Sequence, residues 1–141
     1  MLDKEFIRKK MDLLTGYIGK LEKLSAPDIK TIKQDDSSRA AIERYFQQAV
    51  DTMIDINTHL IKHGNFGTVD DLQSTFKMLG DFNVLGKEFS VKIAPIVGVR
   101  NMLVHRYEKL DIDMFLNNLK RNFSDFKTYL IQISEYLDKN N

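Results

Sequence analysis

Apolar residues recur at alternating spacings of three and four along three long stretches of the chain. They are Ile7, Met11, Leu14, Ile18 and Leu21 in the first stretch, Ile42, Phe46, Ala49, Met53, Ile56 and Leu60 in the second, and Leu116, Leu119, Phe123, Phe126, Leu130, Ile133 and Leu137 in the third. This spacing keeps apolar side chains on one stripe of an α-helix and favours side-by-side packing of helices. The first two stretches carry a second apolar edge, which predicts two neighbours for each helix, within this chain or in a second copy.

Residues that stop and start helices separate these stretches. They are residues 26–28 after the first helix, Asp36 and Ser37 before the second, 63–67 after it, and 68–71 before a short third helix that ends near Gly80. A fourth helix is predicted from about Gly86 to Tyr107, and Asp111 opens the last. The pattern predicts an all-α fold, an up-and-down four-helix bundle with an extra short helix, as a single domain over residues 1–141.

Composition narrows the class of protein without naming a function. Among 141 residues, 21 Lys and Arg nearly balance 20 Asp and Glu, so contact with nucleic acid must come from a local patch. The absence of cysteine excludes disulfides and thiolate chemistry. Residues 1–6 lack the apolar core of a signal peptide, and the apolar run 93–99 is too short to span a bilayer. We therefore expect a cytoplasmic protein that makes no contact with a membrane.

Several other polar and aromatic residues have an ordinary structural interpretation. His59 and His63 lie four apart and could bind a metal, but no third ligand is near in sequence, so we predict no metal site and no cofactor. Basic residues of the first and last helices fit solvated helix faces better than phosphate contacts: Arg8, Lys9, Lys10, Lys120 and Arg121. Most aromatic residues are expected in the core: Phe46, Phe82, Phe89, Phe123 and Phe126.

Residues 100–107 concentrate side chains that are suited to catalysis. They include Arg100, Asn101, His105 and Tyr107. A guanidinium donates as a fork to phosphate oxygens, and a histidine near its ordinary pKa can both take and give a proton at neutral pH. These two groups are what RNA cleavage without a metal ion requires.

Arg100 falls in the middle of an otherwise apolar stripe of the predicted fourth helix. That stripe consists of Phe89, Ile93, Ile96, Arg100, Leu103 and Tyr107. A guanidinium in such a place is costly unless it pairs with an acid or reaches a water-filled cleft. The stripe alone leaves both interpretations open: a structural arginine paired with a neighbouring helix, or a functional one.

The angular position of His105 complicates a functional interpretation. Five residues at 3.6 per turn place His105 about 140° around the helix from Arg100, whereas Asn101 lies one turn before His105 on its own face. One solution is a helix distorted by Pro95 and Gly98. The other is a twofold axis that brings two copies of this helix together over one cleft, which we favour because it also supplies two histidines.

The spacing Arg100-x4-His105-x-Tyr107 on a penultimate helix resembles the signature of HEPN-domain ribonucleases, specifically the HepT-like toxin family. In that family a polar residue follows the arginine, as Asn101 does here, and the trailing tyrosine marks the HepT-like branch. Residues 41–49 of the second predicted helix are also similar to the family.

The resemblance implies the toxin of a type VII-like toxin–antitoxin system. It implies a homodimer that cuts RNA without a metal ion at the dimer cleft, with Arg100, His105 and Asn101 as catalytic residues. The implied partner is a nucleotidyltransferase antitoxin that silences the toxin by transferring AMP to Tyr107 (AMPylation).

Two rival interpretations remain open at this point. One is a catalytically silent helical dimer that only binds a nucleotidyltransferase. The other is a structural bundle in which Arg100 and His105 belong to a buried polar network.

Overall fold

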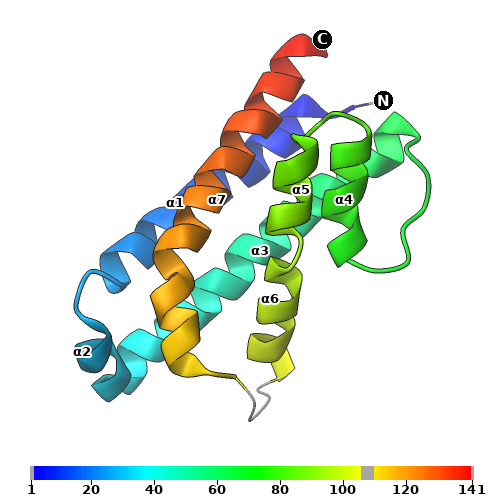
Figure 1. Ribbon diagram of the computed structural model, residues 1–141. Helices are drawn as coiled ribbons and strands as arrows, with labels where there is room; N and C mark the ends of the chain where they lie inside the picture. Colours follow the sequence, from blue (N-terminus) through cyan, green and yellow to red (C-terminus); the bar gives the residue numbers. More distant parts are fainter. Residues whose placement is uncertain (1, 106–109, 141) are drawn as a thin grey trace.

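The chain folds into an all-helical, up-and-down bundle whose two termini lie at the same end (Figure 1). The computed structural model describes residues 2–105 and 110–140. The helices are α1 (Lys4–Leu24), α2 (Ile29–Gln34), α3 (Asp36–Gly64), α4 (Gln73–Asp81), α5 (Lys87–Ile93), α6 (Ile96–His105) and α7 (Ile112–Lys139). The predicted fold class is confirmed. In the described ranges, no helix is both long and apolar enough to cross a bilayer.

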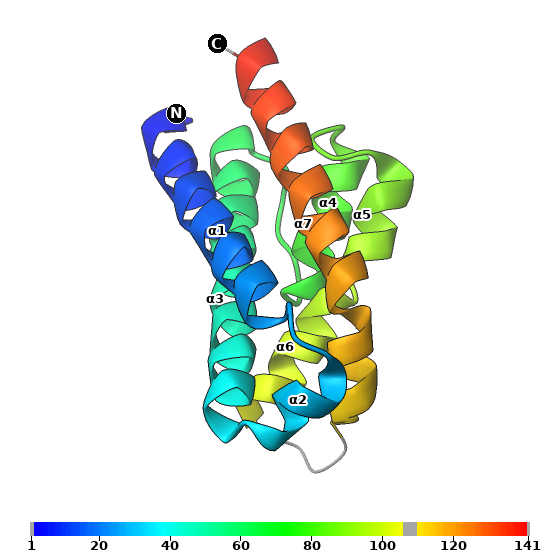
Figure 2. The same cartoon turned by 90° about the vertical axis from the view of Figure 1, so that its left-hand side faces the viewer.

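The three predicted apolar stripes build the core. All six stripe residues of α3 are at most 1% exposed, and α1 lies along α3 for most of its length (Figure 2). Phe46 of α3 meets Phe115 of α7 edge-on, with ring centroids 5.1 Å apart. The second apolar edge of α3 is also buried within the chain, because α4 and α6 cover the side that α1 leaves open.

Aspartate side chains cap the helices close to the predicted starts. Asp35, one residue before the predicted Asp36, accepts hydrogen bonds from the backbone N–H groups of Ser37 and Ser38. The bond from the Ser38 backbone, followed by that from its side chain, lowers the pKa of Asp35. The short helix α2 was not predicted, because it has six residues, of which only Ile32 is buried, and therefore shows no periodic pattern.

The predicted fourth helix is interrupted at Ala94–Pro95, which separates α5 from α6. Proline lacks the backbone N–H of a helix and its ring clashes with the preceding turn. The apolar stripe nevertheless survives the break: Ile93, Ile96 and Leu103 are all buried. The proline therefore changes the path of the chain while α5 and α6 keep facing the same core.

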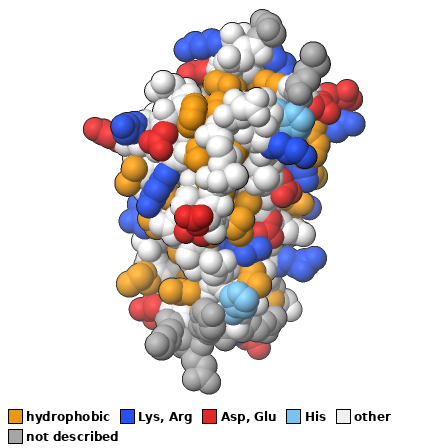
Figure 3. Space-filling view, turned by 90° about the vertical axis from the view of Figure 1, so that its right-hand side faces the viewer, with side chains coloured by type: hydrophobic (Ala, Val, Ile, Leu, Met, Phe, Trp, Pro, Cys, Tyr) orange, Lys and Arg blue, Asp and Glu red, His pale blue; other side chains and the backbone are white. Residues whose placement is uncertain are grey.

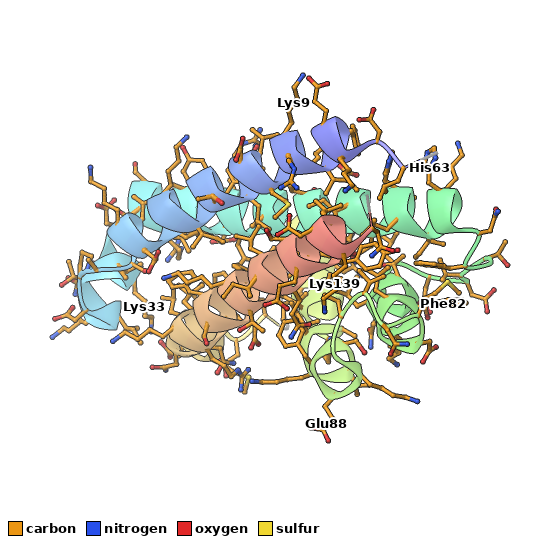
Figure 4. All side chains as sticks on the ribbon, turned by 90° about the horizontal axis from the view of Figure 1, so that it is seen from above. Lys9, Lys33, His63, Phe82, Glu88 and Lys139 are labelled. Atoms are coloured by element: carbon orange, nitrogen blue, oxygen red, sulfur yellow. The ribbon has the colours of Figure 1, made fainter. Side chains whose placement is uncertain are left out.

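The predicted exposure of Lys9 and the predicted burial of Phe82 have different outcomes. Lys9 points away from the bundle and pairs with Glu5, as expected for a solvated face (Figure 4). The prediction that Phe82 belongs to the core is wrong: it is 46% exposed and stacks on Phe66 beyond the end of α4. Phe82 follows the last turn of its helix, where a periodic stripe no longer determines burial.

Candidate active site on helices α3 and α6

The guanidinium of Arg100 lies at the edge of the core between α6 and α3. Its Nε donates a hydrogen bond to Oδ1 of Asp51 at 2.7 Å, and its Nη1 donates to Oδ1 of Asn101 at 2.9 Å. The Arg100 side chain is 22% exposed and that of Asp51 is 46% exposed. The pair thus satisfies the partly buried cation and leaves both side chains in contact with solvent.

The elements behind this pair hold it in place. On α6, Ile96, Val97 and Leu103 are buried and anchor the helix on either side of Arg100. On α3, Asp51 stands between the buried residues Val50 and Thr52. The two side chains meet because neither helix can rotate without exposing its apolar contacts.

His105 is the last residue of α6 and its side chain is exposed. Because α6 is helical from Ile96 to His105, the two side chains keep the angular separation of about 140° that an α-helix imposes. The break at Pro95 precedes Arg100 and cannot change this angle. The distorted-helix explanation is therefore wrong for this subunit. Tyr107 lies outside the described residues.

A groove of about 600 Å³ runs along the surface of α3 and α6, near the part of α6 that carries Arg100 and His105. It is lined by Asp36, Arg39, Ala40, Glu43, Arg44, Gln47, Leu103 and Val104. Leu103 and Val104 lie between Arg100 and His105 in the chain, so the groove borders the segment that carries both candidate catalytic residues, although neither of them lines it.

Helix α6 finishes and α7 begins at the same end of the bundle (Figure 1), and three apolar side chains of these two helices are exposed. Met102 is 38%, Val104 40% and Met114 61% exposed. The side of the molecule that carries α4, α5 and α6 mixes hydrophobic, basic and acidic side chains and has no dominant sign of charge (Figure 3). This end offers apolar surface next to the exposed His105.

The histidines His59 and His63 lie in the last turns of α3, where both are partly covered. Nε2 of His59 accepts a hydrogen bond from the backbone N–H of Asp3, and its ring stacks on those of Phe6 and His63. Burial, followed by the charge of His63, lowers the pKa of His59. Within residues 2–105 and 110–140 no three His, Cys, Asp or Glu side chains gather in a way that could hold a metal ion.

Two residues of the site were missed at the level of sequence. The prediction included an acidic partner for Arg100 as the structural interpretation, but it did not name Asp51. Arg44 on the groove wall was not singled out either. The available signal was the spacing of Arg44, Gln47 and Asp51 along one polar face of a largely buried helix.

Comparison with known sequences places most of the chain in one family. Residues 14–133 match the family model described as ribonuclease HepT-like. The tRNA nuclease HepT of Aphanizomenon flos-aquae is 27% identical over 131 residues, 93% of this chain and 89% of the relative. The mRNA nuclease HepT of Shewanella oneidensis is 24% identical over 103 residues, 73% of this chain and 77% of the relative.

Solved structures share the fold at low sequence identity. A toxin–antitoxin complex with AMP-PNP has a TM-score of 0.86 and 21% identity, covering 93% of this chain and 98% of that one. The tri-AMPylated Shewanella oneidensis HEPN toxin in complex with MNT antitoxin has a TM-score of 0.84 and 22% identity, covering 92% and 96%. These similarities establish the same arrangement of helices.

Proposed function

The chain belongs to the ribonuclease HepT-like family and is a ribonuclease, and from that premise we propose that it is the toxin of a type VII-like toxin–antitoxin system. The observation that carries the proposal is the state of Arg100: Asp51 and Asn101 orient it, yet it keeps access to solvent. A phosphate-binding arginine requires that access.

The proposed reaction is a transesterification that needs no metal ion. The 2′-oxygen of the RNA attacks the adjacent phosphorus, the bond from phosphorus to the 5′-oxygen breaks, and a 2′,3′-cyclic phosphate and a 5′-hydroxyl result. Arg100 stabilises negative charge on the non-bridging oxygens. One His105 takes the proton of the 2′-hydroxyl and a second protonates the leaving 5′-oxygen. Asn101 and Asp51 orient the guanidinium.

The second His105 comes from a second copy of the chain in this proposal. The exposed apolar residues Met102, Val104 and Met114 supply a surface for a twofold contact beside His105. Such a contact would place two α6 helices across one cleft and overcome the separation of Arg100 and His105 within one subunit.

Chelation and histidine replacement test the proposed chemistry. We expect the protein to cut total cellular RNA in the presence of EDTA, and His105→Ala to lower the rate by about a thousandfold. His63→Ala, a histidine at the other end of the bundle, is the matched control and should cut normally. Loss of all cleavage in EDTA contradicts the metal-free scheme. Normal cleavage by His105→Ala excludes the site, whereas absence of cleavage by the wild type favours the silent, nucleotidyltransferase-binding alternative.

We further propose that a nucleotidyltransferase antitoxin of the MNT type silences the protein by transferring AMP to Tyr107. A phosphodiester-linked adenylate there would add negative charge and bulk two residues after His105 and would oppose the binding of RNA phosphate. The adjacent gene identifies the antitoxin to use. Co-expression with it should add the mass of one or more adenylates to the wild type and none to Tyr107→Phe. An unmodified wild-type protein would overturn this regulation.

A further inference from the structure

Among the described residues, one arginine of the groove between α3 and α6 forms no ion pair. Arg39 pairs with Asp36 at 3.1 Å and lies 4.0 Å from Glu43. Both acids of the groove are therefore close to Arg39. Arg44 is exposed on the same wall and has no acidic partner within residues 2–105 and 110–140. Two acids and two arginines line the groove, and Arg44 is the arginine that stays available to an anionic ligand.

The position of Arg44 relates the groove to Arg100. Arg44, Gln47 and Asp51 are spaced by three and four and share one face of α3. Seven residues of helix advance about 10 Å, so Arg44 lies two turns along α3 from the acid that orients Arg100. Leu103 of α6 lines the opposite wall. A chain bound at Arg100 that follows the groove passes Arg44.

We propose that this groove binds the RNA strand next to the bond that is cut, with Arg44 contacting a flanking phosphate. The proposal rests on the proposed function, because it takes Arg100 as the residue at the reacting phosphate. A guanidinium suits a phosphate, Leu103 and Val104 give apolar surface for a ribose or base, and Gln47 offers a donor and an acceptor. The volume of about 600 Å³ suits a nucleotide-sized group.

Binding of a non-cleavable RNA separates this groove from the chemistry. The probe is a fluorescein-labelled 2′-O-methyl RNA oligonucleotide, which has no attacking hydroxyl, and the readout is fluorescence anisotropy over a series of salt concentrations. Arg44→Gln should raise Kd about tenfold and reduce the slope of log Kd against log salt by about 0.7. Arg44→Lys should keep that slope, because it keeps the charge.

Arg121→Gln is the matched control. Arg121 is an exposed arginine of α7 that lines no part of this groove and has no acidic partner in the described ranges. Its replacement should leave Kd within about twofold, as expected for a surface charge outside the binding site.

Two results would overturn the proposal: unchanged RNA affinity in Arg44→Gln, or an equal loss of RNA affinity in Arg121→Gln. If Arg44→Gln lost binding to the nucleotidyltransferase and kept its RNA affinity, the groove would be assigned to that protein instead. Absence of cleavage by the wild type, with the Arg44 dependence of RNA binding preserved, would contradict the proposed function alone.

Discussion

Helix α3 carries two polar clusters that differ in their access to water. Around Asn57 the network is sealed: Asn57 Nδ2 donates to Oγ1 of Thr75 at 3.1 Å, and the hydroxyl of Tyr129 lies 2.6 Å from Oδ1 of Asn57. Asn57 and Tyr129 are 0% exposed. Around Asp51, six residues earlier in the chain, the pair with Arg100 remains open at the surface.

The difference separates a cluster that supports the fold from one that can act on a ligand. In the sealed cluster burial raises the pKa of Tyr129, so its hydroxyl stays a neutral donor. Among the described residues every buried side-chain nitrogen and oxygen has a hydrogen-bond partner, and Asn57 and Tyr129 expose no surface to a substrate. In the open cluster two bonds orient Arg100 while its side chain still reaches solvent. Loss of either cluster should therefore have distinct consequences.

The largest expected effect is on catalysis at the open cluster. Arg100→Ala should lower kcat/KM for RNA cleavage by about a thousandfold, because the charge that develops on the phosphate oxygens loses its donor. Its Tm should stay near that of the wild type, because the site is partly solvated. Steady-state cleavage assays and thermal melting measure the two quantities. If Arg100→Ala had a lowered Tm and a normal kcat/KM, the open cluster would support the fold and not catalysis.

The sealed cluster should show the opposite behaviour. Asn57→Ala should lower the free energy of unfolding by about 3 kcal/mol, since it removes two buried side-chain hydrogen bonds and opens a small cavity. At temperatures where the variant remains folded, kcat should be unchanged. Urea denaturation measures the loss, and the exposed neighbour Thr58→Ala serves as the control. Equal effects of the two substitutions would show that the network contributes nothing.

Asp51 both orients Arg100 through a hydrogen bond and places a negative charge beside it. Two substitutions of Asp51 separate these two effects. Asp51→Ala should lower kcat about tenfold because the guanidinium loses the acceptor at Nε. It should also lower KM, because removal of a negative charge strengthens binding of phosphate. Asp51→Asn keeps an oxygen acceptor and should recover most of kcat with the same low KM.

Asp55→Asn is the control for the Asp51 series, since Asp55 lies one turn further along α3 and pairs with Lys10 of α1 instead of Arg100. It should leave both kinetic parameters unchanged. A parallel fall of kcat with a rise of KM in Asp51→Ala would indicate general damage to the site in place of positioning.

The smallest effect is expected at the far end of α3, where His59 is half-covered. Burial lowers the pKa of His59 in the folded protein, so below about pH 6.5 the unfolded chain binds more protons than the folded one. Stability should be full above that pH and fall as the pH drops toward the lowered value, with a loss of Tm on the order of 1–2 °C. Thermal melting from pH 7.5 to 5 measures it, and His59→Gln should show less of this decline. An equal decline in both proteins would assign it to other groups.

The sequence by itself predicted the three long helices α1, α3 and α7 and the segment that carries the candidate catalytic side chains, but not the short helix α2. Alternating spacings of three and four defined the core of α1, α3 and α7, because a helix of 3.6 residues per turn must place those residues on one side. A distortion of the helix at Pro95 could also be considered from sequence alone, since proline lacks the backbone N–H wherever the helix lies. Arg100, Asn101 and His105 were identified from composition and spacing within ten residues, and their roles stay proposals.

Only the tertiary structure decided which residues meet. Asp51 faces Arg100 because α3 packs against α6, and 49 residues separate the two in the chain. No local pattern distinguishes Asp51 from Asp55, which is turned toward α1 and Lys10. The same packing places Arg44 in the wall of the groove and buries Asn57 against Tyr129. Periodicity determines which side of a helix is buried, but the partner on the other side depends on how separate helices dock, and that is a property of the whole chain.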